Sequence, residues 1–109
     1  MIKDDTVYLR HILDAINTIQ EYIKGMDYEG FRASNLVQDG VIRQLEIVGE
    51  ATKNLSQEIR EKHPDIPWKD MAGMRDKLIH QYFGVDIAGI WDTAEQDIPI
   101  LKSNLIKLL

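Results

Sequence analysis

The chain has 109 residues, of which 44% are hydrophobic and 28% charged, a balance typical of one folded domain, here residues 1–109. It has no cysteine, which excludes disulfides, thiolate nucleophiles and cysteine-based zinc sites. The formal net charge of −5 argues against broad, charge-driven coating of nucleic acid, but it leaves room for a local basic site.

The first residues predict where the protein resides. The stretch from Met1 to Asp5 holds no apolar core of the signal-peptide type. No apolar run approaches the length of about 20 residues that spans a bilayer. We therefore expect a cytoplasmic protein that does not contact a membrane, and the lack of cysteine fits a reducing compartment.

The first predicted element is a helix from about Asp4 to Lys24, with Gly25 as its terminator. Its apolar residues recur every three or four positions and share one face. They are Leu9, Ile12, Leu13, Ile16, Ile19 and Ile23. A short turn is expected over residues 26–31.

A second helix is expected to start with Ser34 or Asn35 as its cap and to last until about Glu61. His63-Pro64 would end it, because proline disfavours helix in the residue before it. The apolar stripe of this helix is Val37, Val41, Leu45, Val48, Thr52, Leu55 and Ile59.

Two prolines predict an extended connection after this helix, and the second, Pro67, can open a short helical turn through Met71. A separate third helix should follow and end at Gly84. Asp86 would cap a fourth helix, in which Pro99 should produce a kink or a break. The fourth stripe is Ile87, Ile90, Trp91, Ala94, Ile98, Leu101, Leu105 and Leu108.

No stretch alternates with the period of two that indicates a strand. Four amphipathic helices joined by short loops predict an all-α, antiparallel bundle.

The third predicted helix carries the densest chemistry of the chain, with Arg75, Asp76, His80 and Tyr82 within eight residues. Arginine keeps a permanent positive charge, and histidine exchanges a proton near neutral pH. Asp76 lies one turn before His80 and can accept a hydrogen bond from its ring. Arg75 and His80 differ by about 140° around the helix axis, so they are not stacked.

Cleavage of RNA without a metal ion is a reaction compatible with these groups. The 2′-hydroxyl attacks the neighbouring phosphate, a base removes its proton, and an acid protonates the leaving oxygen. Arg75 would hold the phosphate and stabilise its developing charge, and His80 would be the acid or base. One histidine can hardly do both, so two copies in a dimer would supply them.

A plainer interpretation stands beside this one. On spacing alone, Arg75 can be a solvated residue paired with a carboxylate, and His80 a residue stabilised at a helix C-terminus. A tyrosine such as Tyr82 usually packs its ring and turns its hydroxyl to water. Glu46 and Glu50 are one turn apart, but a solvated face is the better explanation than a metal site, so we expect no metal or cofactor.

The segment from Gly73 to Tyr82 resembles the signature of HEPN-domain proteins, and specifically of the HepT toxin family: Arg, Asn or Asp, three residues, His, one residue, Tyr. Other landmarks follow the same order along the chain. They are Val48-Gly49-Glu50-Ala51, Ile66-Pro67-Trp68, and Val85-Asp86 with Trp91. The resemblance therefore covers essentially the whole chain.

This resemblance implies a four- to five-helix HEPN bundle that is homodimeric, with both Arg-x4-His motifs lining a shared cleft. It implies the endoribonuclease toxin of a type VII HEPN/MNT toxin–antitoxin system, acting on RNA such as tRNA or mRNA. Arg75 and His80 would be catalytic and Asp76 supporting. The antitoxin would be an MntA-like nucleotidyltransferase that transfers AMP from ATP to the motif tyrosine, here Tyr82. Each AMP adds negative charge and bulk where RNA phosphates must dock.

The alternative is a non-catalytic helical module that binds a nucleotide or serves as the partner subunit of a nucleotidyltransferase. The net charge of −5 and the single ionisable base of the motif modestly favour this alternative.

Overall fold

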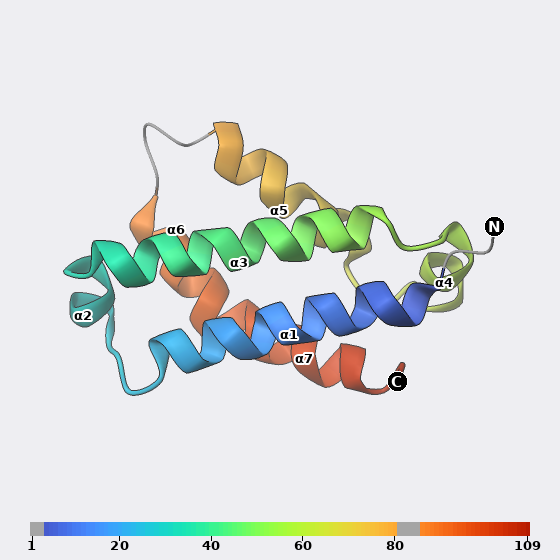
Figure 1. Cartoon of the computed structure of the whole chain (residues 1–109), viewed down its shortest axis with the longest axis horizontal. Coiled ribbons are helices and arrows are strands. Elements are labelled where there is room, and N and C mark those ends of the chain that lie inside the picture. The colour runs from blue at the N-terminus through green and yellow to red at the C-terminus, as the bar shows by residue number, and fades with distance from the viewer. Residues whose placement is uncertain (1–3, 81–85) are drawn as a thin grey trace.

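The computed structural model describes residues 4–80 and 86–109, with side chains described for residues 4–74 and 86–109. Over these ranges the chain is helical, and the prediction of an all-α bundle is confirmed (Figure 1). The elements are α1 (Asp5–Ile23), α2 (Tyr28–Arg32), α3 (Asn35–Lys53), α4 (Gln57–Lys62), α5 (Trp68–His80), α6 (Ile87–Asp92), a π-helical segment (Thr93–Asp97) and α7 (Ile98–Ile106).

The two long helices α1 and α3 form the frame of the bundle (Figure 1). They pack side by side and antiparallel, α5 packs on α3, and α7 packs on α1. The apolar stripes predicted for the helices meet in one core. Its fully buried members include Ile12, Ile16, Ile19, Phe31, Val41, Val48, Met71, Ile98 and Leu105.

Local signals set the first helix as predicted. The Asp4 carboxylate accepts a hydrogen bond from the amide of Thr6 at 3.0 Å, which satisfies one of the free amides of the first turn. Gly25 follows the helix with φ of +75°, a left-handed conformation that glycine adopts without the steric penalty of a side chain.

The turn expected over residues 26–31 is wrong, because this segment contains the short helix α2. The Asp27 carboxylate caps α2 by accepting from the amide of Gly30 at 2.8 Å. The buried Gln38 side chain of α3 donates to the carbonyls of Phe31 and Arg32 at 2.9 and 2.8 Å. A helix of five residues is too short to persist alone, and these contacts with α3 hold it.

The continuous second helix expected up to Glu61 is also wrong. Ser34 caps α3 as predicted, but α3 ends at Lys53 and α4 begins at Gln57. Between them, the amide and hydroxyl of Ser56 donate to the Asp5 carboxylate at 2.8 and 2.6 Å. This contact with α1 holds the chain in an extended conformation at Ser56 and breaks the helix.

The separate helical turn expected from Pro67 to Met71 merges with the third helix into the single helix α5. The amide of Met71 donates to the carbonyl of Pro67 at 3.0 Å, so the first turn is already continuous with the helix. The Trp68 indole donates to the carbonyl of His63 at 2.9 Å, which fixes the entry to α5. Gly84, predicted to end this helix, lies outside the described residues.

The fourth helix is interrupted near Pro99, as predicted. Asp86 caps α6 by accepting from the amide of Gly89 at 3.0 Å. After α6 the chain widens into the π-helical segment, where the amide of Ile98 bonds the carbonyl of Thr93. Pro99 has no amide hydrogen and its ring crowds the carbonyl four residues earlier, which accounts for the departure from the α-helical pattern.

The short helices α2 and α6 pack against each other. Phe31 of α2 and Trp91 of α6 are both buried, with ring centroids 5.2 Å apart and planes tilted by 39°. Among residues 4–80 and 86–109, no helix combines the length and the apolar character needed to cross a membrane.

Candidate functional site

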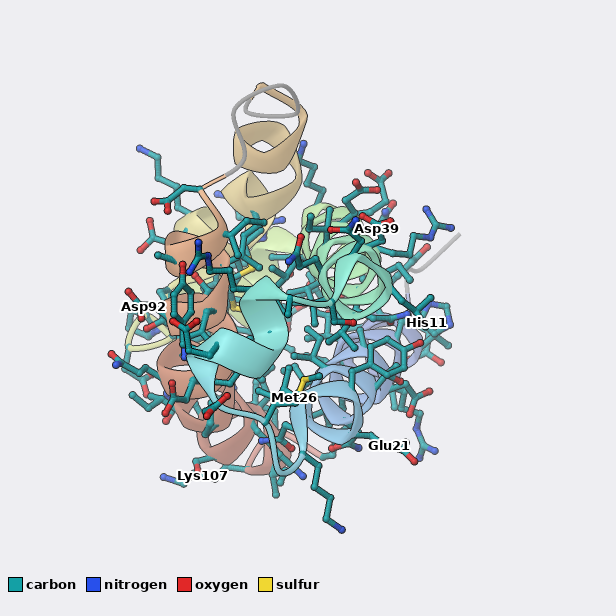
Figure 2. All side chains as sticks on the ribbon, turned by 90° about the vertical axis from the view of Figure 1, so that its left-hand side faces the viewer. His11, Glu21, Met26, Asp39, Asp92 and Lys107 are labelled. Carbon is teal, nitrogen blue, oxygen red and sulfur yellow. The ribbon has the colours of Figure 1, made fainter. Side chains whose placement is uncertain are left out.

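The predicted motif lies on the C-terminal half of α5. Arg75, Asp76 and His80 all belong to this helix, although their side chains are outside the described part of the chain. Tyr82 lies outside the described residues altogether. In both Figure 1 and Figure 2 the ribbon of α5 extends at this end away from the other helices. The positions of the motif on α5 therefore lie on the part of this helix that projects from the bundle.

The N-terminal half of α5 attaches this helix to the rest of the bundle. Trp68 is 6% exposed and Met71 fully buried, and α5 packs on α3 through this half. Because helices repeat every 3.6 residues, position 75 continues the side of α5 that carries Trp68 and Met71. Position 80 follows Gly73 by two turns and lies on the side of Gly73. A single α5 therefore does not place positions 75 and 80 on one face.

A cavity of about 520 Å³ lies beside α5, on the side of Gly73. It is bounded by α5, by α6 with the π-helical segment, and by one residue of α3. The apolar part of its wall consists of Leu45, Met74 and Ile90. The apolar wall of the cavity is therefore shared by α3, α5 and α6.

The polar groups of this cavity are mostly hydrogen-bond acceptors. Three carboxylates, those of Asp70, Asp86 and Asp97, line it together with Lys69 among the described residues. The Thr93 hydroxyl also lines it and donates to the carbonyl of Gly89 at 3.0 Å. With three aspartates against one lysine, this lining is acidic and disfavours a bound phosphate.

At Gly73 the backbone of α5 borders the cavity without a side chain. A Cβ atom added there would meet nothing within 4 Å. At Gly40, in contrast, an added Cβ would come within 2.8 Å of Cε2 of Tyr22, so close packing of α1 on α3 explains that glycine. No contact inside the described chain explains Gly73, which in a helix costs about 1 kcal/mol relative to alanine.

Glu46, weighed above as a metal ligand, and the histidine His11 have ordinary structural surroundings. Glu46 lies 3.9 Å from an Arg43 guanidinium nitrogen on the surface of α3. His11 lies on the outer side of α1 (Figure 2), with its ring edge-on to Tyr8. No group of three His, Cys, Asp or Glu residues that could hold a metal ion occurs within the described ranges.

Sequence reasoning missed the cavity, since its walls come from three separate parts of the chain. The available signals were the helical glycine Gly73 and the carboxylate of Asp86, which was predicted only as a cap. Neither signal shows by itself that the two residues line the same space.

The described structure is thus a HEPN-type helical bundle in which positions 75, 76 and 80 belong to α5, a helix that borders a cavity. The family described as ribonuclease HepT-like matches residues 12–108. The chain belongs to this HepT-like ribonuclease family, and the predicted resemblance is confirmed.

Curated relatives support the same assignment. "Probable ribonuclease HepT" of Thermococcus cleftensis is 48% identical over 101 residues, which cover 93% of this chain and 92% of that protein. "Putative RNase MJ0125" of Methanocaldococcus jannaschii is 47% identical over 107 residues, 98% of this chain and 92% of the relative. The prediction that the chain is a ribonuclease is thereby confirmed at the level of the family.

A third relative is longer than this chain. "Gamma-glutamylcyclotransferase and putative RNase MJ0434" of M. jannaschii is 50% identical over 109 residues, and the chain spans 49% of its length. No solved structure matches the chain significantly.

Proposed function

We propose that this chain is the endoribonuclease toxin of a type VII toxin–antitoxin system and cleaves RNA through Arg75 and His80 without a metal ion. One observation carries the proposal: in a member of the HepT-like ribonuclease family, the whole Arg-x4-His motif lies on one continuous helix, α5, anchored by Trp68 and Met71. Catalysis of this kind depends on catalytic groups that a shared element holds in position relative to one another.

In the proposed reaction the 2′-oxygen of a nucleotide attacks the adjacent phosphorus while a base removes the 2′-proton. The bond from phosphorus to the 5′-oxygen then breaks, an acid protonates that oxygen, and a 2′,3′-cyclic phosphate remains. His80 serves as the acid or base. Arg75 binds the phosphate and stabilises the charge that develops on it, and Asp76 orients the histidine.

The proposal includes a homodimer. Positions 75 and 80 lie about 140° apart around α5, and each chain offers one His80. A second copy supplies the second histidine and a second Arg75 to a shared cleft. Acid and base then come from different subunits.

The proposed partner is an MntA-like nucleotidyltransferase that attaches AMP to Tyr82 two residues after His80. The phosphate of AMP carries negative charge to the place where an RNA phosphate must bind, so modification would silence the toxin. A reducing cytoplasm that supplies RNA and ATP is the compartment in which we place both proteins.

The direct test is cleavage of labelled tRNA and mRNA by the purified chain in excess EDTA. We expect cleavage by the unmodified protein and a loss of 100-fold or more, roughly the contribution of a general acid or base, in His80→Ala. Arg75→Ala should lose a similar amount, because it removes the charge that stabilises the transition state. Lys107→Ala, an exposed cation beyond the end of α7, is the matched control and should retain activity.

The modification is tested by intact-mass measurement after incubation with ATP and the nucleotidyltransferase. Added AMP units on the wild type and none on Tyr82→Phe are expected. Tyr22→Phe, at an exposed tyrosine of α1, is the control and should be modified like the wild type. An unchanged mass of the wild type, or modification of Tyr82→Phe, would count against Tyr82 as the acceptor.

The alternative function is that of a non-catalytic partner subunit of a nucleotidyltransferase. The net charge of −5 and the acidic lining of the cavity favour it. Growth on expression separates the two. Toxicity that survives in His80→Ala would contradict catalysis by His80.

A further inference from the structure

We propose that the cavity beside α5 binds one base of the RNA substrate, next to the scissile phosphate, and that it prefers guanine over uracil. This inference rests on the proposed ribonuclease function and adds a base preference to it. Three features of the described residues support it: the position of the cavity, its volume with its apolar wall, and the polar chemistry of its lining.

The position follows from the helix register. Gly73 lines the cavity, and position 80 lies two helix turns further along the same side of α5, a rise of about 10 Å. We infer that a phosphate held near position 80 places its neighbouring nucleotide on the side of α5 that borders the cavity. The base of that nucleotide enters, and the sugar–phosphate chain stays at the end of α5.

The volume and the apolar wall suit a nucleotide base. A volume of about 520 Å³ falls within the range of roughly 300–1,000 Å³ that small-molecule sites occupy. Leu45, Met74 and Ile90 provide apolar surface for the face of a base. The open space in front of Gly73 lets the base approach the helix backbone, which is a reason for a glycine that intrachain packing does not explain.

The chemistry of the lining selects among bases. The carboxylates of Asp70, Asp86 and Asp97 accept hydrogen bonds and repel phosphate, so they favour a neutral group rich in donors. One oxygen of Asp86 already accepts from the amide of Gly89 at 3.0 Å, which leaves Asp70 and Asp97 with the larger share of free acceptor capacity.

Guanine matches this lining better than the other bases. It offers two adjacent donors, N1–H and the N2 amino group, to the two oxygens of one carboxylate. Cytosine and adenine each offer one amino group. Uracil offers one N–H between two carbonyl oxygens, which would face the carboxylates. We therefore expect guanine first, adenine and cytosine next, and uracil last.

The test is the rate of cleavage of the sixteen dinucleoside monophosphates, measured as kcat/KM. In the wild type, guanine at one of the two nucleotide positions should exceed uracil by roughly tenfold or more, as expected for a good bidentate contact. Gly73→Leu, which extends a side chain into the cavity, should bring this ratio near one. Asp97→Asn should lower it, because the amide presents a donor to the donors of guanine.

Ala88→Leu is the matched control, since Ala88 lies exposed on α6 and does not line the cavity. It should keep the wild-type ratio. Circular dichroism should show Gly73→Leu folded, and Gly73→Ala, whose Cβ meets open space, provides a smaller filling of the cavity. Equal rates for guanine and uracil in the wild type would overturn the proposal, and so would a ratio that Gly73→Leu leaves unchanged.

A second measurement separates this inference from the proposed function. Guanosine added to the isotope-labelled protein should shift the NMR signals of Leu45, Ile90 and Thr93 at lower concentration than uridine does, whether or not the protein cleaves RNA. Absent cleavage with guanosine binding would refute the ribonuclease and retain the subsite. Cleavage with no guanosine binding would do the reverse. A change of sedimentation mass in Gly73→Leu, with the base preference unchanged, would identify the cavity as an interface between copies and overturn the subsite.

Discussion

At the scale of single residues, Gln38 shows how one buried polar group holds a short helix. Its amide donates to the carbonyls of Phe31 and Arg32, and the side chain is 8% exposed. Gln38→Leu leaves these carbonyls without that donor and should lower the free energy of unfolding by about 1–3 kcal/mol. Urea denaturation measures this. Gln96→Leu, at an exposed position, should change it by less than about 0.5 kcal/mol, and equal losses in both variants would contradict the assignment.

At Gly73 we expect a substitution to change the free energy of unfolding in the opposite direction. Gly73→Ala should raise the free energy of unfolding by about 0.5–1 kcal/mol, because the added Cβ meets open space and alanine favours helix. Thermal denaturation should place Gly73→Ala above the wild type. Gly40→Ala should gain less or lose stability, since its Cβ would come within 2.8 Å of the Tyr22 ring. The reverse order would show that Gly73 is needed for packing inside the chain.

At the scale of elements, the hydrogen bonds from Ser56 to Asp5 determine where α3 ends and α4 begins. Ser56→Ala removes both the hydrogen bonds of its hydroxyl to Asp5 and its cap on the amide of Ile59, at 2.6 and 3.3 Å. We expect a loss of about 1–2 kcal/mol.

A double-mutant cycle with Asp5→Ala should give a coupling energy of about 0.5 kcal/mol or more. Ser103→Ala, at an exposed serine of α7, serves as the control. Additive effects of the two substitutions would mean that the contact does not stabilise the break between α3 and α4.

These elements also show what a sequence predicts and what it does not. The caps at Asp4, Ser34 and Asp86 are local signals that lie within three residues of the amides they satisfy, and their helices begin as predicted. The break between α3 and α4 depends on Asp5, 51 residues away from Ser56. The helix α2 likewise depends on Gln38 of α3. At the α3–α4 break a contact between distant segments overrode the periodic apolar pattern, and at α2 a side chain of the following helix stabilises a helix where a turn was expected.

The candidate site also has one part that a local pattern predicts and one part that depends on contacts between distant segments. The motif on α5 is a local pattern and was predicted from spacing and resemblance. The cavity combines Leu45, Gly73 and Asp97, which meet only through the packing of α3, α5 and the π-helical segment. No spacing in the sequence indicates that these residues are neighbours.

At the scale of the whole molecule, the net charge of −5 limits how RNA can bind. Because the chain and the described lining of the cavity are acidic, we expect few phosphate contacts, chiefly at the proposed site of Arg75. The logarithm of the RNA association constant should therefore fall with the logarithm of salt concentration with a shallow slope of about −1 to −2, as two or three neutralised phosphates give. Fluorescence anisotropy with a 2′-O-methyl RNA measures it. A slope of about −5 or steeper would indicate an extended basic surface and contradict this account.

We propose that this HepT-like bundle cleaves RNA with His80 of α5. The measurement that tests it most directly is cleavage of labelled RNA in EDTA by the wild type and by His80→Ala, purified in the same way and shown by circular dichroism to be equally folded. The account predicts cleavage by the wild type and a loss of 100-fold or more in the variant. Equal cleavage by the two proteins, or none by the unmodified wild type, would contradict it.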